Sequence, residues 1–329
     1  MADSQSIARE VRIAAERFLV RFRELDVAAA REPPEPLFDQ LAAAMDQLLD
    51  DCRATGLWGP ENRLPSSELW NVAGDALARG WLQNRARTKP RGYAGDYELL
   101  ARMFHHRLCD DPLGRLMDEY FQRDAAPVAV RNRMAMIADW IVEGVRSRGG
   151  LPVRVAVVGS ALGLDVRAAL LRLTDEERAA VSVTLLDLDP DAVEFARSQL
   201  APFLPPGQIQ AVACNLFRMP QRPQLAAALA NIDLLFCPGI FDYLDAAAGA
   251  AMLRLFWDRL APGGRMTVFQ FAPHNPSRAL MEWIGNWYLV YREQGELELM
   301  AAAAGIPREA ATFGAEPLGV DLFVTAERR

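Results

Sequence analysis

A β-branched run, Val153-Arg-Val-Ala-Val-Val158, leads into Gly159-Ser-Ala-Leu-Gly163 and then into helical spacing from Asp165 to Leu173. A short apolar run that ends in glycine is typical of a strand buried on both faces. Small residues after such a strand let backbone N–H groups approach a ligand, and the N-terminus of the next helix favours negative charge. The loop is not GxGxxG, so alone it indicates a ligand-binding unit only weakly.

The alternation of apolar strands and helices continues from this stretch to the C-terminus. Further strands are predicted over 181–186, 209–213, 232–236, 266–271 and 319–325, and helices over 190–200, 246–260 and 277–303. Apolar strands that alternate with helices are typical of βαβ units in a parallel sheet with both faces covered. We therefore expect an α/β fold, doubly wound and Rossmann-like, with a mainly parallel sheet.

The first 148 residues show helical spacing only. Helices are predicted over 7–30, 37–54, 66–81, 97–103 and 124–147, and prolines at 33, 34 and 36 end the first of them. At Gly149-Gly150 the pattern changes from helical spacing alone to strands that alternate with helices. The sequence thus predicts two domains, an all-helical N-terminal lid or substrate domain at 1–148 and a Rossmann-like domain at 149–329.

Composition limits the classes of function. The chain has 329 residues, 51% of them hydrophobic, and can bury a sizeable core. Lys and Arg number 36 against 43 Asp and Glu, a net charge of −7 that argues against a dedicated nucleic-acid binder. No run of about eighteen apolar residues occurs and no apolar signal-peptide core opens the chain, so we expect neither a membrane span nor export.

Cysteine and histidine usage indicates location and metal content. The four cysteines are far apart and show no CxxC spacing: Cys52, Cys109, Cys214 and Cys237. This pattern favours reduced thiols in a cytoplasmic protein. Only three histidines are present, so we expect no metal site. The expected partner is a small-molecule substrate, with the protein a monomer or homodimer and with no nucleic acid or membrane.

Polar residues follow the predicted strands, where doubly wound sheets bind their ligands. Asp187 ends the second strand, and a carboxylate there can accept hydrogen bonds from both ribose hydroxyls of a nucleoside cofactor. Asn215 follows the third strand with an amide placed to meet a purine edge. The fourth strand leads into Cys237-Pro-Gly-Ile-Phe-Asp-Tyr-Leu244, and Leu260-Ala-Pro-Gly-Gly264 introduces the fifth.

This ordered set resembles the class I S-adenosylmethionine (SAM) dependent methyltransferases over roughly 150–329. The resemblance implies a mainly parallel seven-stranded sheet and SAM as methyl donor or substrate. It implies that Gly159, Ser160 and Gly163 surround the methionine part, that Asp187 holds the ribose, and that Asn215 with Leu216 faces adenine. The remaining cofactor-binding candidates that it implies are Ala161, Leu188, Pro238 and Gly239. The family usually has a DxGxGxG-type loop and an adenine-side Asp, whereas this chain has GSALG with no preceding acid, and Asn215.

A narrower resemblance rests on Lys89-Pro-Arg-Gly-Tyr-Ala-Gly-Asp-Tyr-Glu98 and on residues 275–292, NPSRALMEWIGNWYLVYR. Both segments look like a bacterial subgroup associated with 3-hydroxypalmitate methyl ester biosynthesis. Homologues of similar build include azetidine-2-carboxylate synthases, which cyclise SAM itself. In that reaction the amino nitrogen attacks Cγ and methylthioadenosine leaves.

The catalytic candidates are Tyr93, Asp96 and Tyr243. In a lid, Tyr93 and Tyr97 are positioned to contact the SAM carboxylate or sulfonium, with Asp96 as orienting group or weak base. The turn at 92–97 has an alternative interpretation as a plain helix connection. The substrate candidates are Arg91, Tyr97, Asp242 and His274.

Each remaining feature also has a structural interpretation. The basic residues at 79–91 form either a solvated face or, through Arg91, a carboxylate-recognition site. Asp189 precedes Pro190 and is the better helix-cap candidate than Asp187. His274 fits a base or a surface loop equally well. The aromatic residues at 283–291 have spacings that favour packing over a binding site.

The sequence and the resemblance leave three functions open. The first is methyl transfer from SAM to a carboxylate, hydroxyl or amine of a small molecule in bacterial secondary or signal metabolism. The second is cyclisation of SAM to azetidine-2-carboxylate with release of methylthioadenosine. The third, from another class, is a non-catalytic SAM-binding or interaction protein.

Overall fold

The computed structural model describes residues 4–31, 35–221 and 227–329. Contacts divide the chain into two compact units, Met1–Val128 with Pro276–Leu289, and Ala129–Asn275 with Val290–Arg329. We call them the helical unit and the sheet unit. This division differs from the expected boundary after residue 148, because most of the helix at 125–147 packs on the sheet and the segment 276–289 packs among the helices. Each unit is described by itself.

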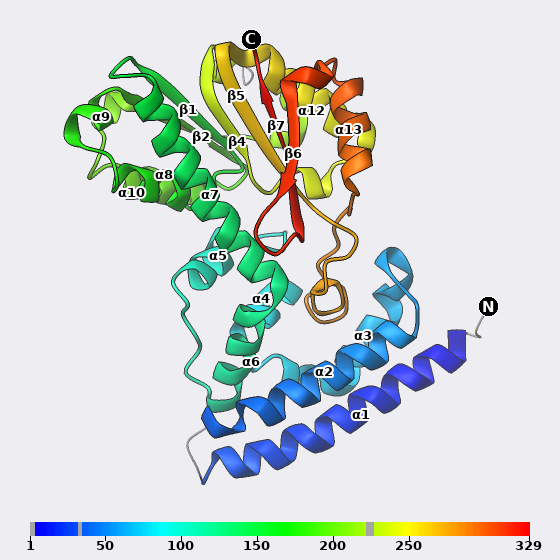
Figure 1. Ribbon diagram of the computed structural model, residues 1–329. Helices are drawn as coiled ribbons and strands as arrows, with labels where there is room; N and C mark the ends of the chain where they lie inside the picture. Colours follow the sequence, from blue (N-terminus) through cyan, green and yellow to red (C-terminus); the bar gives the residue numbers. More distant parts are fainter. Residues whose placement is uncertain (1–3, 32–34, 222–226) are drawn as a thin grey trace. The chain divides into compact units, whose positions relative to one another are not determined.

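The sheet unit contains one seven-stranded sheet (Figure 1). Its strands are β1 (Val153–Val158), β2 (Val181–Asp187), β3 (Ile209–Ala213), β4 (Ile232–Cys237), β5 (Leu260–Phe271), β6 (Ala311–Ala315) and β7 (Asp321–Glu327). The strand order is β3-β2-β1-β4-β5-β7-β6, and β7 runs antiparallel to the other six strands. The expected doubly wound, mainly parallel seven-stranded fold is confirmed. β5 begins earlier than predicted, at Leu260, and β6 was not predicted.

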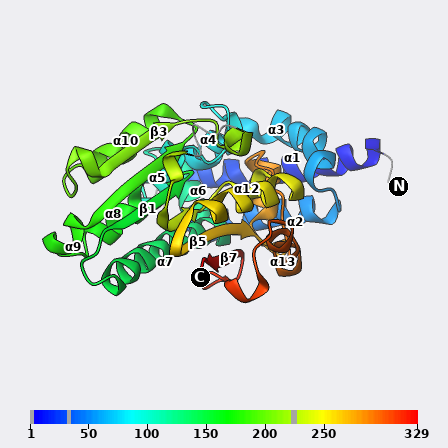
Figure 2. The ribbon, with the colours of Figure 1, turned by 90° about the horizontal axis from the view of Figure 1, so that it is seen from above.

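Helices cover both faces of this sheet (Figures 1 and 2). On one face α7 (Ala125–Ser147), α8 (Leu164–Leu170) and α10 (Pro190–Leu200) bury a core with Val155 and Val157. On the other, α12 (Ala246–Arg259) and α13 (Gln294–Ala303) pack over Ala156 and Val158. A short helix, α9 (Asp175–Ala179), precedes β2. Successive β1 side chains thus enter different cores, which is why β1 reads as a continuous apolar run.

Local chemistry fixes where these helices begin. The Asp189 carboxylate accepts from the Asp191 N–H at 2.9 Å, ahead of Pro190 at the first helical position of α10. Asp245 caps α12 through the Ala248 N–H in the same way. Side-chain caps satisfy N–H groups that have no partner within the helix. The predicted cap at Asp189 is confirmed, which leaves Asp187 outside the helix.

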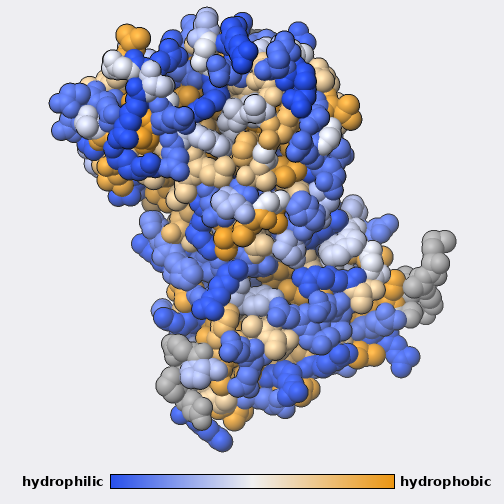
Figure 3. Space-filling model, viewed as in Figure 1, coloured by the Kyte–Doolittle hydropathy of each residue, from blue (hydrophilic) through white to orange (hydrophobic). Residues whose placement is uncertain are grey.

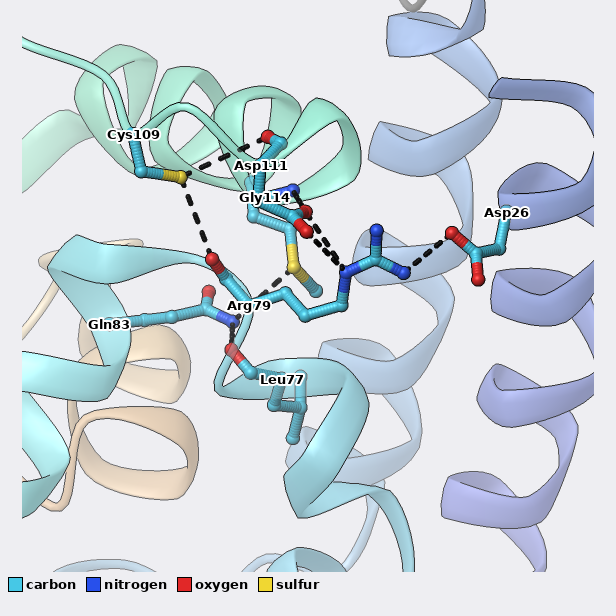
Figure 4. A network of polar contacts seen from close by, with 8 residues as sticks. Asp26, Leu77, Arg79, Gln83, Cys109, Asp111 and Gly114 are labelled. Atoms are coloured by element: carbon cyan, nitrogen blue, oxygen red, sulfur yellow. Dashed lines mark hydrogen bonds and ion pairs between the residues drawn. The ribbon is translucent and has the colours of Figure 1, made fainter. Parts of the chain in front are cut away.

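The helical unit contains α1 (Ser4–Ala29), α2 (Phe38–Ala54), α3 (Arg63–Leu77), α4 (Trp81–Thr88), α5 (Tyr97–Phe104) and α6 (Pro112–Arg123). Arg79 links three of its parts (Figure 4). Its guanidinium contacts Asp26 at 2.6 Å and Asp111 at 2.9 Å. Asp111 also caps α6 through the Gly114 N–H. The described residues of 4–124 form helices, turns and loops without a strand, as the sequence predicts.

The predicted helix at 277–303 is confirmed only at its end, where α13 covers Gln294–Ala303, and is wrong as a continuous helix. Before α13 the chain forms one π-helical turn, Leu280–Ile284, and then an irregular segment. Asn286 adopts a left-handed conformation with φ of 48°, and a side chain at Gly285 would lie 2.9 Å from the Met281 carbonyl oxygen. Trp283 is fully buried. Tertiary packing therefore overrides the helical spacing of this segment.

Hydrophilic residues occupy much of the face seen in Figure 3, with hydrophobic residues in scattered patches. Across the described ranges, no helix is long and apolar enough to cross a membrane.

Candidate functional site

The loop after β1 is a tight turn over the end of β2. The N–H groups of Gly159 and Ser160 both donate to the Leu186 carbonyl, at 2.8 and 3.0 Å, and Gly163 N–H donates to the Ser160 carbonyl at 2.8 Å. Gly159 and Gly163 have φ of 75° and 61°, where glycine is favoured. Ala161 also has positive φ, at 43°. The backbone of this loop is thus held in a defined shape at the end of β1.

Close packing explains both glycines. A Cβ at Gly159 would lie 3.0 Å from the Ile240 side chain, and one at Gly163 would lie 3.2 Å from Ala196. Between them, the Ser160 hydroxyl is buried and has no hydrogen-bond partner among the described residues. A buried hydroxyl without a partner costs free energy unless a ligand or water satisfies it. Ser160 therefore fits a ligand-binding loop.

Asp187 is fixed against this loop. One carboxylate oxygen accepts from the Ala161 N–H at 2.8 Å, and the other accepts from the Asp189 N–H at 3.1 Å. Burial raises the pKa of Asp187, while the backbone N–H groups that it accepts from oppose that shift. Each carboxylate oxygen has a further lone pair, so the group retains capacity for two more donors such as a pair of ribose hydroxyls.

The other expected cofactor residues lie along the same edge. Leu188 is 45% exposed beside Asp187, and Asn215 is exposed after β3. The Leu216 side chain is buried in the core, so only its backbone remains for a ligand. Pro238 and Gly239 are half-buried after β4, and the nearest atom to a Cβ built at Gly239 is an Arg133 nitrogen, at 4.0 Å.

Three buried carboxylates around Arg133 extend this edge. Of these residues only Asp242 was expected from the sequence, and Arg133, Asp165 and Asp321 were not. Arg133 from α7 donates to Asp321 at 2.8 Å, and its charge also acts on Asp165 and Asp242. Because Phe271 ends β5 and pairs with Asp321, the start of antiparallel β7 meets the carboxyl ends of the parallel strands. We call these four residues the Arg133 cluster.

Burial dominates the electrostatics of the Arg133 cluster. It raises the pKa of Asp165 to about 6, and it raises the pKa of both Asp242 and Asp321 despite the nearby arginine. The second oxygen of Asp321 is buried without a hydrogen-bond partner in the described chain. Arg292 also acts on Asp242, so three acids and two arginines interact at this edge, which gives it capacity for a cationic ligand. No local sequence pattern marks these residues, although Asp165 lies two residues after the glycine loop.

Asp242 positions the segment after β4. Its carboxylate accepts from the Gln270 side chain and the Phe271 N–H, both at 2.8 Å, and its carbonyl accepts from the Val290 N–H at 2.7 Å. Arg292 donates to the Phe241 carbonyl at 3.0 Å and to the Leu244 carbonyl. Asp242 is thus an internal anchor rather than an open substrate contact. Tyr243, beside it, is 41% exposed.

His274 lies exposed after β5. One ring nitrogen is 2.9 Å from the Gly319 carbonyl oxygen, so the imidazole connects the loop after β5 to the turn before β7. This contact leaves the other ring nitrogen for a ligand. His274 shares the sheet edge with Asp242 and Tyr243, as the strand-end argument predicts.

The remaining candidates lie in the helical unit. Asp96 is 1% exposed, caps α5 through the N–H groups of Glu98 and Leu99, and binds Arg85 at 2.8 Å. Its oxygens therefore already have donors, which makes it a poor base. Arg91 contacts Glu98 at 3.3 Å and stacks over Tyr97 at 4.6 Å.

Gly95 lies against an aromatic ring in this turn. A Cβ there would lie 2.5 Å from Trp287, so the turn is packed in place. Tyr93 is half-buried in the same turn. The proposed roles of Tyr93, Tyr97 and Arg91 toward SAM remain predictions.

The strand order, with β7 antiparallel to the other strands, defines a doubly wound Rossmann-like fold, and a glycine loop lies beside the acidic end of β2. Comparison with solved structures agrees on the fold. A possible exported protein from Bordetella parapertussis aligns over 100% of this chain and 97% of its own, with 18% identity and a TM-score of 0.56. The CurJ carbon methyltransferase aligns over 98% of this chain and 92% of its own, with 11% identity and a TM-score of 0.54. No protein-family model and no curated protein sequence matches the chain.

Proposed function

We propose that this protein is a SAM-dependent enzyme that methylates a small molecule, with SAM bound at the carboxyl edge of the parallel strands. One observation carries the proposal. Asp187 ends β2 and is held by the Ala161 N–H of the glycine loop at 2.8 Å. This contact supports the assignment of Asp187 to the ribose, because the carboxylate lies beside a loop suited to the methionine part. A protein with the same fold, CurJ, is a carbon methyltransferase.

The surrounding residues fit SAM by their chemistry. The Ser160 hydroxyl lacks a partner among the described residues, and the Arg133 cluster has more acids than cations for a ligand with an ammonium and a sulfonium. We assign Gly159, Ala161 and Gly163 to the methionine part and Leu188 to the ribose. Asn215 and the Leu216 backbone would contact adenine, while Pro238 and Gly239 would line the methyl group.

Bound SAM would supply an electrophilic methyl group. The residues of this chain would orient SAM and the acceptor and exclude water from the reacting atoms. In-line displacement at a sulfonium depends mainly on orientation and on exclusion of water. The hydrogen bonds of Asp242 and Arg292 fix the backbone that carries Tyr243, which supports our assignment of its exposed phenol to the acceptor side. A carboxylate acceptor needs no base, whereas a hydroxyl or amine would lose its proton to a neighbouring group such as His274 or Tyr243.

Isothermal titration with SAM tests the proposal directly. Asp187→Asn should weaken SAM binding by about tenfold or more, because a charged hydrogen-bond acceptor is lost. Asp191→Asn is the matched control, since this carboxylate is exposed on α10 nearby. Absence of SAM binding to the wild-type protein would overturn the proposal. Tight binding without turnover on any acceptor would favour the non-catalytic alternative.

One observation favours cyclisation of SAM as a second candidate. Asp165 lies in the first turn after the glycine loop, and its pKa of about 6 suits a base for an amine. The amino nitrogen would form a bond to Cγ as the Cγ–S bond breaks, its proton would pass to the carboxylate, and methylthioadenosine would leave. Incubation with SAM alone separates the candidates. Azetidine-2-carboxylate with methylthioadenosine indicates cyclisation, whereas S-adenosylhomocysteine appearing only with an acceptor indicates methyl transfer.

We also propose a cytoplasmic location and a monomeric or homodimeric state. Four free cysteines support the location, because free thiols persist in a reducing compartment. Cell fractionation and light scattering test the two statements separately.

A further inference from the structure

The basic segment 79–91 divides into two sets of cations. Arg79, Arg85 and Arg91 each contact an acid. Arg87 and Lys89 contact none among the described residues. The segment therefore contains three cations with an acidic partner and two without one among the described residues.

Arg87 and Lys89 are held in place by neutral groups. One Arg87 nitrogen donates to the Ser66 hydroxyl at 2.6 Å, and the guanidinium lies 5.0 Å from the Trp70 ring. The Lys89 ammonium donates to the Asn286 carbonyl at 2.6 Å. Lys89 itself has φ of 48° at the end of α4. Both cations are thus fixed by the fold without being neutralised.

Arg63, at the start of α3, joins them. Its guanidinium lies 4.9 Å from the Tyr288 ring and has no acidic partner in the described ranges. Partial burial lowers the pKa of Lys89, and the charges of Arg87 and Arg63 lower it further. Arg63 begins the helix that carries Ser66, the acceptor for Arg87, and Lys89 lies two residues after Arg87, so the three cations lie near one another. We call Arg63, Arg87 and Lys89 the cationic cluster.

Glu282, an acid that acts on Tyr288, is paired with another cation. Glu282 faces Tyr288, but one of its oxygens binds Arg278 at 2.8 Å. The other accepts from the Gly59 N–H at 2.7 Å and from Asn62 at 2.8 Å. Glu282 is therefore already paired with the charge of Arg278 and holds two neutral donors. The cationic cluster retains about three positive charges.

An unused donor lies beside the cluster. The Trp70 indole N–H is buried and has no partner in the part of the chain described, and Arg87 stacks on the same ring. Partial burial also lowers the pKa of Arg87, which reflects the cost of removing its charge from water. Like charges gathered with unused donors are stabilised when an anion with several oxygens binds among them.

We propose that Arg63, Arg87 and Lys89 form a binding site for the phosphate group of a small-molecule ligand. Three cations exceed the charge of a single carboxylate and match a dianionic phosphate. The guanidinium and ammonium groups are the side chains that proteins use for phosphate. The site lies wholly within the helical unit and does not rest on SAM binding.

Lys89 makes the test specific, because it is the only lysine in the chain. An amine-reactive reagent at pH 8 labels only Lys89 and the N-terminal amine, and peptide mass spectrometry separates the two. Inorganic phosphate should slow labelling of Lys89 and leave the N-terminal rate unchanged. Sodium chloride at equal ionic strength and sodium acetate at equal concentration are the comparison conditions.

The variants Arg63→Gln and Arg87→Gln should each weaken phosphate protection by about tenfold, because each removes a charged contact. Arg63→Gln is the decisive variant, because Arg63 is exposed and its loss spares the fold. Arg123→Gln is the matched control, since Arg123 stacks over Phe38 at 4.3 Å but is paired with Glu119. Equal protection by chloride or acetate, or undiminished protection in Arg63→Gln, would overturn the proposal.

Discussion

The Arg133 cluster and the cationic cluster have opposite imbalances of charge. In the sheet unit three buried aspartates interact with Arg133, and in the helical unit three cations gather without an acid among the described residues. Several arginines of both units are paired with carboxylates, as Arg79 and Arg148 are. Burial of unmatched charge costs stability. The comparison teaches that each imbalance indicates a ligand of the opposite sign.

The largest expected effect comes from Arg133→Met. This variant leaves Asp165, Asp242 and Asp321 buried without their central cation and should lower the free energy of unfolding by about 3–5 kcal/mol at pH 8. Urea denaturation measures it. The loss should shrink at pH 5, where the carboxylates bind protons.

Arg148→Met is the matched control for Arg133→Met. Arg148 pairs with Asp233, which also accepts from the Arg154 N–H at 2.9 Å and contacts the Arg154 guanidinium. Because Asp233 keeps these donors, the control should cost about 1 kcal/mol. Equal losses in the two variants would show that the Arg133 cluster is no more strained than an ordinary ion pair.

Asp165→Asn should change how stability depends on pH. The folded protein holds the Asp165 proton up to pH of about 6, against a usual pKa of 3.8. The wild-type free energy of unfolding should therefore fall by about 3 kcal/mol as pH rises from about 4 to about 6. The asparagine variant lacks this loss, so at pH 8 it should be more stable than wild type and bind SAM more weakly.

Thermal denaturation across pH 4 to 8 provides the measurement for Asp165→Asn. Asp191→Asn, at an exposed carboxylate, should follow the wild-type profile. Parallel profiles for wild type and Asp165→Asn would remove Asp165 from the set of strained acids.

The sequence predicts those parts of the fold that depend on local pattern. β1 and β3 have their predicted bounds because β-branched and apolar runs specify them, and Asp187 follows from its position at a strand end. The π-helical turn was missed because buried Trp283 and left-handed Asn286 are set by distant packing. The Arg133 cluster was missed for the same reason, since topology alone gathers its members. The basic segment was noticed, but which cations lack an acid depends on partners scattered from residue 26 to residue 111.

Gly95→Ala tests how firmly the turn after the cationic cluster is held. Gly95 has φ of 69°, and a new Cβ would lie 2.5 Å from Trp287, so we expect a loss of about 2 kcal/mol. Gly92→Ala is the matched control. Gly92 also has positive φ, of 87°, but has nothing within 4 Å, and its loss should be about 1 kcal/mol. Urea denaturation that ranks the two in the reverse order would contradict the packing of this turn.

The smallest expected effect is that of Arg63→Gln on stability. It distinguishes a cation that binds a ligand from one, such as Arg85, that stabilises the fold. Arg63→Gln removes one of three repelling charges, and the Arg63 side chain makes no hydrogen bond within the described residues. At low salt the variant should therefore leave the free energy of unfolding unchanged or raise it by about 0.5 kcal/mol. Arg85→Gln removes the partner of Asp96, which is 1% exposed, and should cost several times more. Added salt should erase the gain of Arg63→Gln because it screens the repulsion. Differential scanning calorimetry at two salt concentrations resolves the contrast. If Arg63→Gln instead destabilises as much as Arg85→Gln, Arg63 has an anionic partner within the chain, and the contrast between the two clusters fails on its cationic side.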